Sequence, residues 1–353
     1  MSHRDFHHEH QPEVPAPAGV GTPPFPQAVT PKSQKGRWAV IHTPRAFHTS
    51  FPEGARPQLK LFKDLWFWVF MIITVPSFLL CLVMMRLSSP INGLVGEGIV
   101  TAVLLALVQI AVVVGLFRLI PIFKGTPKRL IFLALAWGGF SAVALAGGVL
   151  SPPWLSVAEK MGWFSHSMSI GAAVPEELVK ALGVMLLLWI GRAWWNRPWH
   201  GLVAGMLVGL GFDAYENALY SVTMGITHPA SDLQGAVEVF SLRLVAGPLL
   251  HVMFTGIFGW ALGRLMYEGG NFTRAQRWGS ILLWGVVAIS GHYMWNILPS
   301  GEDEFVVNVV SKIIVYIVLV GLLVWLNIAQ SRRVLPLQRA GLEPAVTMSQ
   351  RVK

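Results

Sequence analysis

Apolar residues recur along the chain in long stretches, and short groups of polar residues separate them. A helix that crosses a bilayer needs about 20 mostly apolar residues, because each residue adds about 1.5 Å across a hydrocarbon core of about 30 Å. The pattern predicts eight such helices, at about residues 65–87, 97–120, 130–150, 174–195, 201–224, 240–264, 279–298 and 306–329. The segment 151–173 is too polar to span. We therefore expect an all-α polytopic membrane protein.

Composition supports this class. Hydrophobic residues make up 54% of the chain and charged residues only 13%, whereas soluble proteins carry roughly a quarter charged residues. The single cysteine, Cys81, lies inside an apolar run. One cysteine excludes both an intrachain disulfide and a cysteine-based metal site.

The distribution of basic residues along the chain indicates the membrane topology. Lys and Arg collect in the N-terminal tail, in the second, fourth and sixth loops and in the C-terminal tail, while acidic residues mark the intervening loops. This alternation predicts that both termini are cytoplasmic in a multi-pass protein of the inner (plasma) membrane. The net charge of +9 then indicates contact with the lipid bilayer and not with nucleic acid. The oligomeric state is left open.

Three regions follow from the pattern. Residues 1–64 are rich in proline and contain no spanning run, so we expect a disordered cytoplasmic tail without a cleavable signal peptide. Residues 65–330 form the membrane domain, and residues 331–353 form a basic cytoplasmic tail.

Six ionisable residues interrupt the apolar helices. They are Glu176, Glu177, Lys180, Glu216, His251 and His292. Burying an ionisable group in lipid costs at least a few kcal/mol, so each of these residues is a functional hypothesis.

Helical rise predicts that these residues share one depth. The fifth and seventh helices run outward, which places Glu216 about 22 Å and His292 about 20 Å from the inner face. The fourth and sixth helices run inward, which places Glu176 about 24 Å from its inner end and His251 about 12 Å below the outer surface. All four residues fall in the outer half of the membrane. We therefore expect a catalytic core in helices four to seven.

Local spacing supports this layer. Residues three or four apart share a helix face, so Glu176 or Glu177 can reach Lys180 within one turn, and His292 shares a face with Asn296. Glycine recurs in the helix that carries Glu216, which permits close approach of a neighbouring helix.

Carboxylates and imidazoles in one layer are typical of water activation. Peptide hydrolysis needs a base for water, donors for the tetrahedral oxyanion and an acid for the leaving amine. A glutamate suits the base, and a histidine or asparagine suits the donor. No metal is then required. Alternatively, a divalent metal such as zinc binds with an open water position, and its ligands would be Glu176, Glu216, His251 and His292. The HExxH pattern of zinc proteases is absent.

Each polar residue also has a purely structural interpretation. Lys180 could serve only to neutralise the adjacent glutamates, so that its removal would destabilise the protein and not inactivate it. Glu216 with Asn217 could cap a broken helix. His251 and His292 could be core histidines that bond backbone carbonyls.

Four motifs in this order resemble those of the PrsW-type intramembrane proteases, which are related to CAAX prenyl endopeptidases and bacteriocin-processing membrane proteases. The EExxK motif is met by Glu176 through Lys180, and FxxxE by Phe212 through Glu216, which continues into Asn217. A histidine of the sixth helix is met by His251, and HxxxN by His292 through Asn296. The resemblance covers about residues 170–300.

The resemblance implies an intramembrane endopeptidase that cuts membrane-associated proteins, such as an anti-sigma factor cleaved near its extracytoplasmic side. The resemblance also implies that residues 65–330 are the transmembrane protease domain. It implies catalytic roles for Glu176, Glu177, Glu216, His251 and His292, with support from Lys180, Asn217 and Asn296. Glu176 is the favoured base by analogy with the CAAX relatives, which have a histidine where this chain has Glu216. The alternatives are a proton-coupled transporter, since buried Glu and His also build proton relays, and a non-catalytic membrane scaffold or immunity protein.

Overall fold

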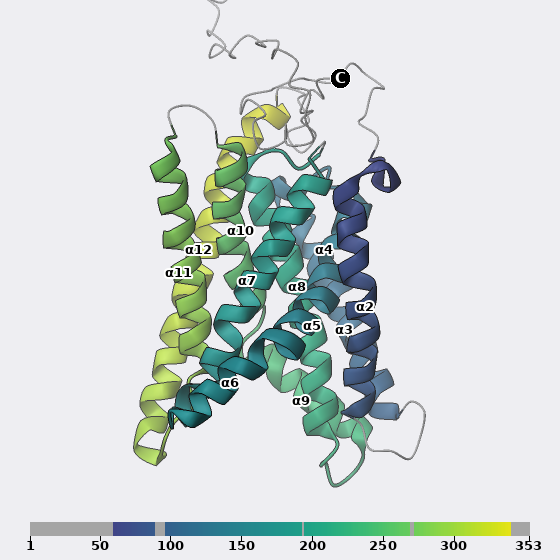
Figure 1. Ribbon diagram of the computed structural model, residues 1–353, viewed down its shortest axis with the longest axis vertical. Helices are drawn as coiled ribbons and strands as arrows, with labels where there is room; N and C mark the ends of the chain where they lie inside the picture. Colours follow the sequence, from purple (N-terminus) through teal and green to yellow (C-terminus); the bar gives the residue numbers. More distant parts are fainter. Residues whose placement is uncertain (1–58, 89–95, 193, 269–271, 340–353) are drawn as a thin grey trace, which may run out of the picture.

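The computed structural model describes residues 59–88, 96–192, 194–268 and 272–339. The predicted disordered tail therefore lies outside the described residues over 1–58, as does the end of the basic tail over 340–353. All regular structure in the described ranges is helical. Most helices run along the long axis of the molecule, with α7, α8 and α10 between α2 and α3 on one side and α11 and α12 on the other (Figure 1).

The helices have the following bounds in chain order. The α-helices are α2 Leu65–Leu87, α3 Glu97–Phe117, α4 Lys128–Ala136, α5 Val143–Leu145, α6 Ser151–Lys160, α7 Ser167–Ile190, α8 Pro198–Gly225, α9 Asp232–Ala246, α10 Leu250–Tyr267, α11 Arg274–Asn296 and α12 Glu302–Arg339. The 3-10 helices are η1 Leu61–Lys63, η2 Pro121–Phe123 and η5 Phe164–His166, and the π-helical stretches are η3 Trp137–Ala142 and η4 Ala146–Leu150.

Four helical segments are long and apolar enough to cross a membrane. They are Leu65–Leu87, Glu97–Phe117, Lys128–Lys160 and Glu302–Pro336, and α9 with α10 makes a fifth if the bent pair counts as one span. Each of the eight predicted segments overlaps helical structure. However, the helices α7, α8 and α11, which carry buried polar residues, are long enough but not apolar enough to count as such spans. The structure thus confirms an all-helical protein with four to five apolar spans, and the count of eight stays a prediction.

The sixth predicted helix, 240–264, is wrong as a single helix. The structure breaks it between α9 and α10, which are bent by 46°. Gly247 (φ −164°, ψ 65°) and Leu249 (φ 59°) leave the helical region, and Pro248 has no N–H to donate to a helical hydrogen bond. The Tyr316 hydroxyl of α12 donates to the Pro248 carbonyl at 3.2 Å and anchors the break. A broken helix, which the sequence interpretation did not find, therefore precedes His251 directly.

The last helix is longer than predicted. The sequence places its end near residue 329, whereas α12 continues to Arg339. Residues 330–340 include no glycine, and the first proline after 329 is Pro336, so no helix-ending glycine occurs before the end of α12. Arg333 also pairs with Glu268 of the α10–α11 connection at 2.9 Å, which holds the extension against the bundle.

Glycines on one face of α8 set its distance from α10. A Cβ atom added at Gly201, Gly205 or Gly209 would lie 2.1–2.2 Å from a backbone carbonyl oxygen of α10. The three residues recur every fourth position, so they form one stripe along the helix. Since only glycine fits this stripe, the two backbones pack in direct contact. The glycine pattern therefore fixes how close α10, which carries His251, lies to α8, which carries Glu216.

Gly205→Ala is expected to destabilise the protein by about 1–3 kcal/mol, because the new methyl group would overpack a rigid interface. Its Cβ would lie 2.2 Å from the Thr255 carbonyl oxygen, and a backbone atom cannot move aside cheaply. Thermal unfolding in detergent measures the change. Gly321→Ala in α12 is the matched control, because it meets no atom within 4 Å and should be neutral or slightly stabilising. Equal unfolding temperatures for the two variants would contradict this account of the α8–α10 contact.

Candidate active site

Helix α7 brings two glutamates into the centre of the bundle. Pro175 lies inside α7 and cannot donate a hydrogen bond to the preceding turn, so the turn before Glu176 lacks one helical hydrogen bond. Glu176 is 8% exposed and Glu177 is fully buried. Successive residues point about 100° apart around a helix. The two neighbouring carboxylates therefore face different surroundings.

The Lys180 ammonium group connects the carboxylates to an imidazole. Its Nζ lies 2.7 Å from Glu177 Oε1, 3.3 Å from Glu176 Oε2 and 2.9 Å from His251 Nδ1. An ammonium group has three N–H donors, so these three acceptors satisfy it completely. The Phe212 ring lies 4.0 Å from Nζ and adds a cation–π contact. Lys180 is fully buried, so its charge is balanced by these neighbours alone.

Glu177 holds two side chains from other helices. Its Oε2 accepts a hydrogen bond from the Thr255 hydroxyl at 3.1 Å, and its Oε1 lies 3.1 Å from His292 Nδ1. Because an ionised carboxylate only accepts hydrogen bonds, Nδ1 of His292 carries a proton. The other ring nitrogen, Nε2, then points toward Glu176 Oε2 at 3.8 Å. The Phe254 ring stacks on the imidazole at 4.7 Å and fixes its plane.

His251 lies in the first turn of α10, directly after the break. Its Nε2 is 3.0 Å from Glu216 Oε2. The same oxygen accepts from Arg243 Nη2 at 2.7 Å, which marks Glu216 as a paired carboxylate. Nε2 of His251 is therefore the donor to Glu216, and Nδ1 accepts from Lys180. The imidazole thus links the α7 pair to the ion pair between α8 and α9.

A second set of polar side chains supports Arg243 from behind. Asn217 accepts a hydrogen bond from Arg243 Nε at 2.7 Å, and its amide nitrogen lies 3.2 Å from Gln109 Oε1. The Gln109 amide donates in turn to Asp213 Oδ2 at 2.7 Å. The Tyr220 ring lies 4.3 Å from the Arg243 guanidinium. These contacts fix the orientation of Arg243 and therefore of Glu216.

A cavity of about 490 Å³ opens beside this network. Its polar lining includes Glu176, Glu216, Arg243, His251, Asn296 and Lys312, together with Asp213 and Asn217. Leu219, Leu250, Phe254 and Trp295 are among its apolar lining residues. Glu177, Lys180 and His292 do not line it. The network therefore has a layer that meets the cavity and a buried layer behind it.

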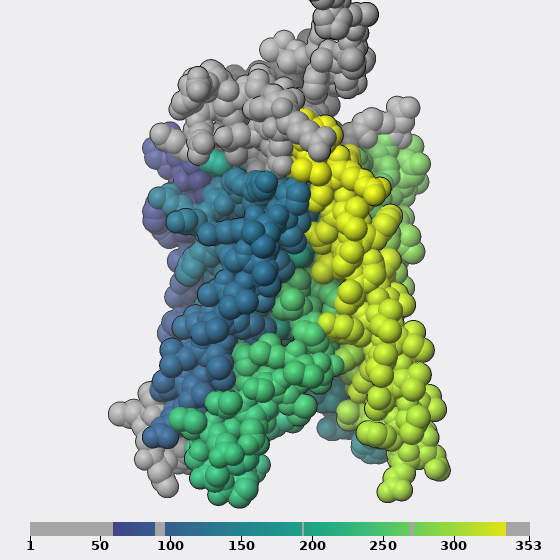
Figure 2. Space-filling view, turned by 180° about the vertical axis from the view of Figure 1, so that it is seen from behind, coloured from purple at the N-terminus to yellow at the C-terminus, as the bar shows by residue number. Residues whose placement is uncertain are grey.

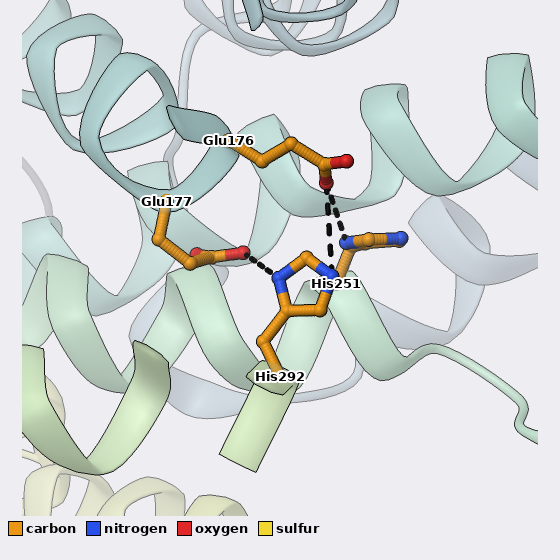
Figure 3. A group of neighbouring side chains, drawn as sticks. All are labelled: Glu176, Glu177, His251 and His292. Atoms are coloured by element: carbon orange, nitrogen blue, oxygen red, sulfur yellow. Dashed lines mark hydrogen bonds and ion pairs between the residues drawn. The ribbon is translucent and has the colours of Figure 1, made fainter. Parts of the chain in front are cut away.

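Four of the side chains offer ligand atoms that lie within 4.8 Å of one another: Glu176, Glu177, His251 and His292 (Figure 3). The two glutamates come from one helix and point toward the two imidazoles. The sequence had placed Glu216 in a metal set, and the structure groups Glu177 there instead. Two imidazoles and two carboxylates are a donor set that zinc accepts.

The structure brings together seven of the eight residues singled out from the sequence, since Asn217 joins them through Arg243. Asn296 lines the cavity, but the structure shows no hydrogen bond from its side chain to a described residue. Both imidazoles bond to carboxylates, in place of the backbone carbonyls that a core histidine would use. Gln109 was missed, and Thr255 was given no role in the site. Thr255 follows His251 by one turn, and Gln109 is the only polar side chain between Val108 and Gly115.

The fold and the site define a class of protein. An all-helical membrane protein with buried carboxylates and imidazoles beside a cavity has the groups that an intramembrane hydrolase needs. A family profile described as PrsW family intramembrane metalloprotease matches residues 126–326. Because the match covers more than half of the chain, this protein belongs to the PrsW family. No curated protein sequence and no solved structure gives a significant match.

The family match confirms the resemblance drawn from the motifs and extends it. It begins at residue 126, before α4, and ends at residue 326 within α12. The protein is therefore an intramembrane protease with a protein substrate. A transporter and a non-catalytic scaffold are not favoured. The family description as a metalloprotease also agrees with the divalent metal that the sequence raised as an alternative.

Proposed function

We propose that the 490 Å³ cavity is where a peptide bond of a membrane-tethered protein is hydrolysed, with Glu176 as the base. The observation that carries this proposal is the position of Glu176. Its carboxylate lines the cavity and also lies within 4 Å of Lys180, His251 and His292. A group that meets both the cavity and the buried network can take a proton from water and return it.

The reaction steps follow from this position. Glu176 removes a proton from a water molecule in the cavity, and the hydroxide attacks the carbonyl carbon of the scissile bond. The oxyanion that forms needs hydrogen-bond donors, and Asn296 and Arg243 are among the cavity-lining side chains that offer them. Glu176 then gives the proton to the leaving amine as the C–N bond breaks. The proton count balances without a further group.

Glu177 and His292 lie in the buried layer behind Glu176 and do not reach the cavity. Since both are buried and neither lines the cavity, we assign them a positioning role. The Glu177–His292 bond directs Nε2 toward Glu176. The sequence interpretation gave both glutamates catalytic roles, and the proposal now divides those roles. His251 and Glu216 fix the Lys180 ammonium between the carboxylates.

The side chains also fit a divalent metal. Glu176, Glu177, His251 and His292 would hold it, and the bound ion would activate water and polarise the substrate carbonyl. The Lys180 ammonium already contacts three of these four residues. A bound cation would therefore replace that ammonium as the counter-charge of the two carboxylates.

We expect exhaustive chelation of the purified protein to reduce peptide cleavage by more than tenfold, and added zinc to restore it. Elemental analysis should give one equivalent of zinc in the wild type and much less in His292→Ala. His228→Ala is the matched control, because His228 pairs with Glu238 in the α8–α9 region and lies outside the cluster. Unchanged hydrolysis after complete metal removal would contradict a metal-dependent mechanism. The mechanism in which a carboxylate alone activates water would then stand.

The topology proposal is a multi-pass protein of the plasma membrane with eight spans and both termini in the cytoplasm. It is supported by the ends of the bundle, since α2 begins and α12 ends at the same end (Figure 1). An even number of crossings gives this arrangement. Met84, near the last turn of α2, and Lys312, in the first third of α12, both line the cavity. The cavity then opens in the outer half of the membrane, and the substrate bond lies near its extracytoplasmic side.

Cleavage of synthetic substrates tests this function. Purified protein in lipid vesicles is given peptides with one membrane-spanning segment and a cleavable stretch placed on either side of it. Mass spectrometry of the products locates the bond. We expect cleavage near the outer end of the segment and none near the inner end. Cleavage confined to the inner end would overturn the proposed topology, and no cleavage of any tethered peptide would overturn the proposed reaction.

A further inference from the structure

A second cavity lies at the opposite end of the bundle from the candidate active site. It has a volume of about 340 Å³ and is formed by the end of α3, the connection through η2 and the start of α4. Arg118, Lys124 and Lys128 line it. In Figure 2 this part of the chain, in blue, lies beside the upper part of α12, in yellow. The cavity is therefore at the end of the protein that the charge pattern assigns to the cytoplasm.

These three cations differ from Arg192 and Arg333 at the same end because they have no acidic partner among the described residues. The structure shows no ion pair between any of them and a described residue, and no Asp or Glu occurs between 118 and 128. By contrast, Arg192 pairs with Asp64, and Arg333 with Glu268. Three unpaired positive charges around one cavity attract an anion.

The backbone of the connection adds hydrogen-bond donors. Helix α4 begins at Lys128 with Pro127 as its N-cap, and no side chain caps it. The first N–H groups of a helix lack partners inside the helix, and together with the helix dipole they favour a phosphate group. The Thr126 hydroxyl oxygen is buried and has no hydrogen-bond partner among the described residues. Gly125, with a φ of 80°, makes the turn that places Thr126 before the helix.

The remaining wall is apolar. It is formed by Val114, Phe123, Ile131 and Leu207. A soluble phosphate ion gains nothing from such a wall, whereas a phospholipid can place its glycerol and upper acyl chain there. Basic pockets between membrane helices on the cytoplasmic side are typical sites for anionic headgroups. We propose that this cavity binds the headgroup phosphate of an anionic phospholipid between Arg118, Lys124, Lys128 and the Thr126 hydroxyl.

Native mass spectrometry of the purified full chain tests this site, with phosphatidylglycerol and phosphatidylcholine of the same acyl chains as probes. We expect phosphatidylglycerol to be retained in preference. Arg118→Gln, Lys124→Gln and Lys128→Gln should each weaken its binding about fivefold, and Thr126→Val should weaken it while it preserves shape. Arg129→Gln is the control, because Arg129 is also exposed and adjacent to Lys128 but does not line the cavity. It should change binding by less than about twofold.

Three outcomes would overturn the proposal. If Arg129→Gln and Lys128→Gln weakened phosphatidylglycerol binding equally, the lipid would be attracted by the positive charge of the whole surface and not by a site. Equal retention of the two lipids would show that the charge is not used. Inorganic phosphate that displaces phosphatidylglycerol at millimolar concentration would identify a soluble anion as the ligand. Because the three substituted cations are exposed, their variants should keep the wild-type unfolding temperature, which is measured alongside.

Discussion

Glu176→Gln is expected to lower the rate of cleavage of a membrane-tethered substrate by about 10²–10⁴, the usual contribution of a general base, while the protein still folds. Gln has the shape of Glu and can still accept from Lys180, but it cannot take a proton from water. The carboxylate lines the cavity, so its loss acts on the reaction directly. Single-turnover cleavage in vesicles measures the rate, and thermal unfolding measures the fold.

The matched control is Glu159→Gln on α6, which removes an exposed carboxylate from another helix of the same protein. It should leave the rate unchanged within about twofold. Glu176→Gln that kept more than about a tenth of the wild-type rate would remove Glu176 from the base role. In that event Glu216, which also lines the cavity, would be the next carboxylate to test.

That the side chains of the site meet was predictable because their relative level depends on regular quantities. Helical rise and alternate helix direction are enough to place Glu176, Glu216, His251 and His292 at one level, and the structure joins them through contacts of 3–4 Å. Neither quantity requires knowledge of how the helices pack. The motif order could be read from the sequence for the same reason, since each motif spans only one or two turns.

The different surroundings of Glu176 and Glu177 were not predictable. Both residues fit the EExxK motif equally, and which of them meets the cavity depends on where α10 and α11 lie around α7. That position depends on contacts such as the glycine stripe of α8 against α10. The helix break before His251 was also not predicted, because the apolar character of a long segment averages over a break of a few residues. Its signal was present in the sequence as Gly247 followed by Pro248.

The supporting polar layer had a weaker signal. Gln109 stands in the apolar run of α3 and is buried, and a lone glutamine in a spanning helix needs a partner. The sequence does not say which one. The partner proved to be Asp213, 104 positions away, so only the packing of α3 on α8 could reveal it.

Lys180→Met is expected to destabilise the protein by about 3–5 kcal/mol, the usual cost of breaking a buried ion pair on one side. The ammonium group is the common partner of Glu176, Glu177 and His251, at 2.7–3.3 Å. Methionine fills a similar volume but removes the charged donor that these three acceptors share, at a position that is fully buried. Thermal unfolding in detergent measures the effect. Lys160→Met, which removes an exposed lysine at the end of α6, should change stability by less than about 0.5 kcal/mol.

A double substitution separates charge from packing. In Lys180→Met combined with Glu177→Gln, the amide can still accept from Thr255, and one of the two uncompensated charges is gone. We expect the pair to be more stable than Lys180→Met alone by at least about 1 kcal/mol, because the residues interact directly and their effects cannot add. Strict additivity would contradict the view that the ammonium group balances the carboxylates. It would mean that Lys180 stabilises the bundle only by packing, and the positions of Glu176 and Glu177 would need another cause.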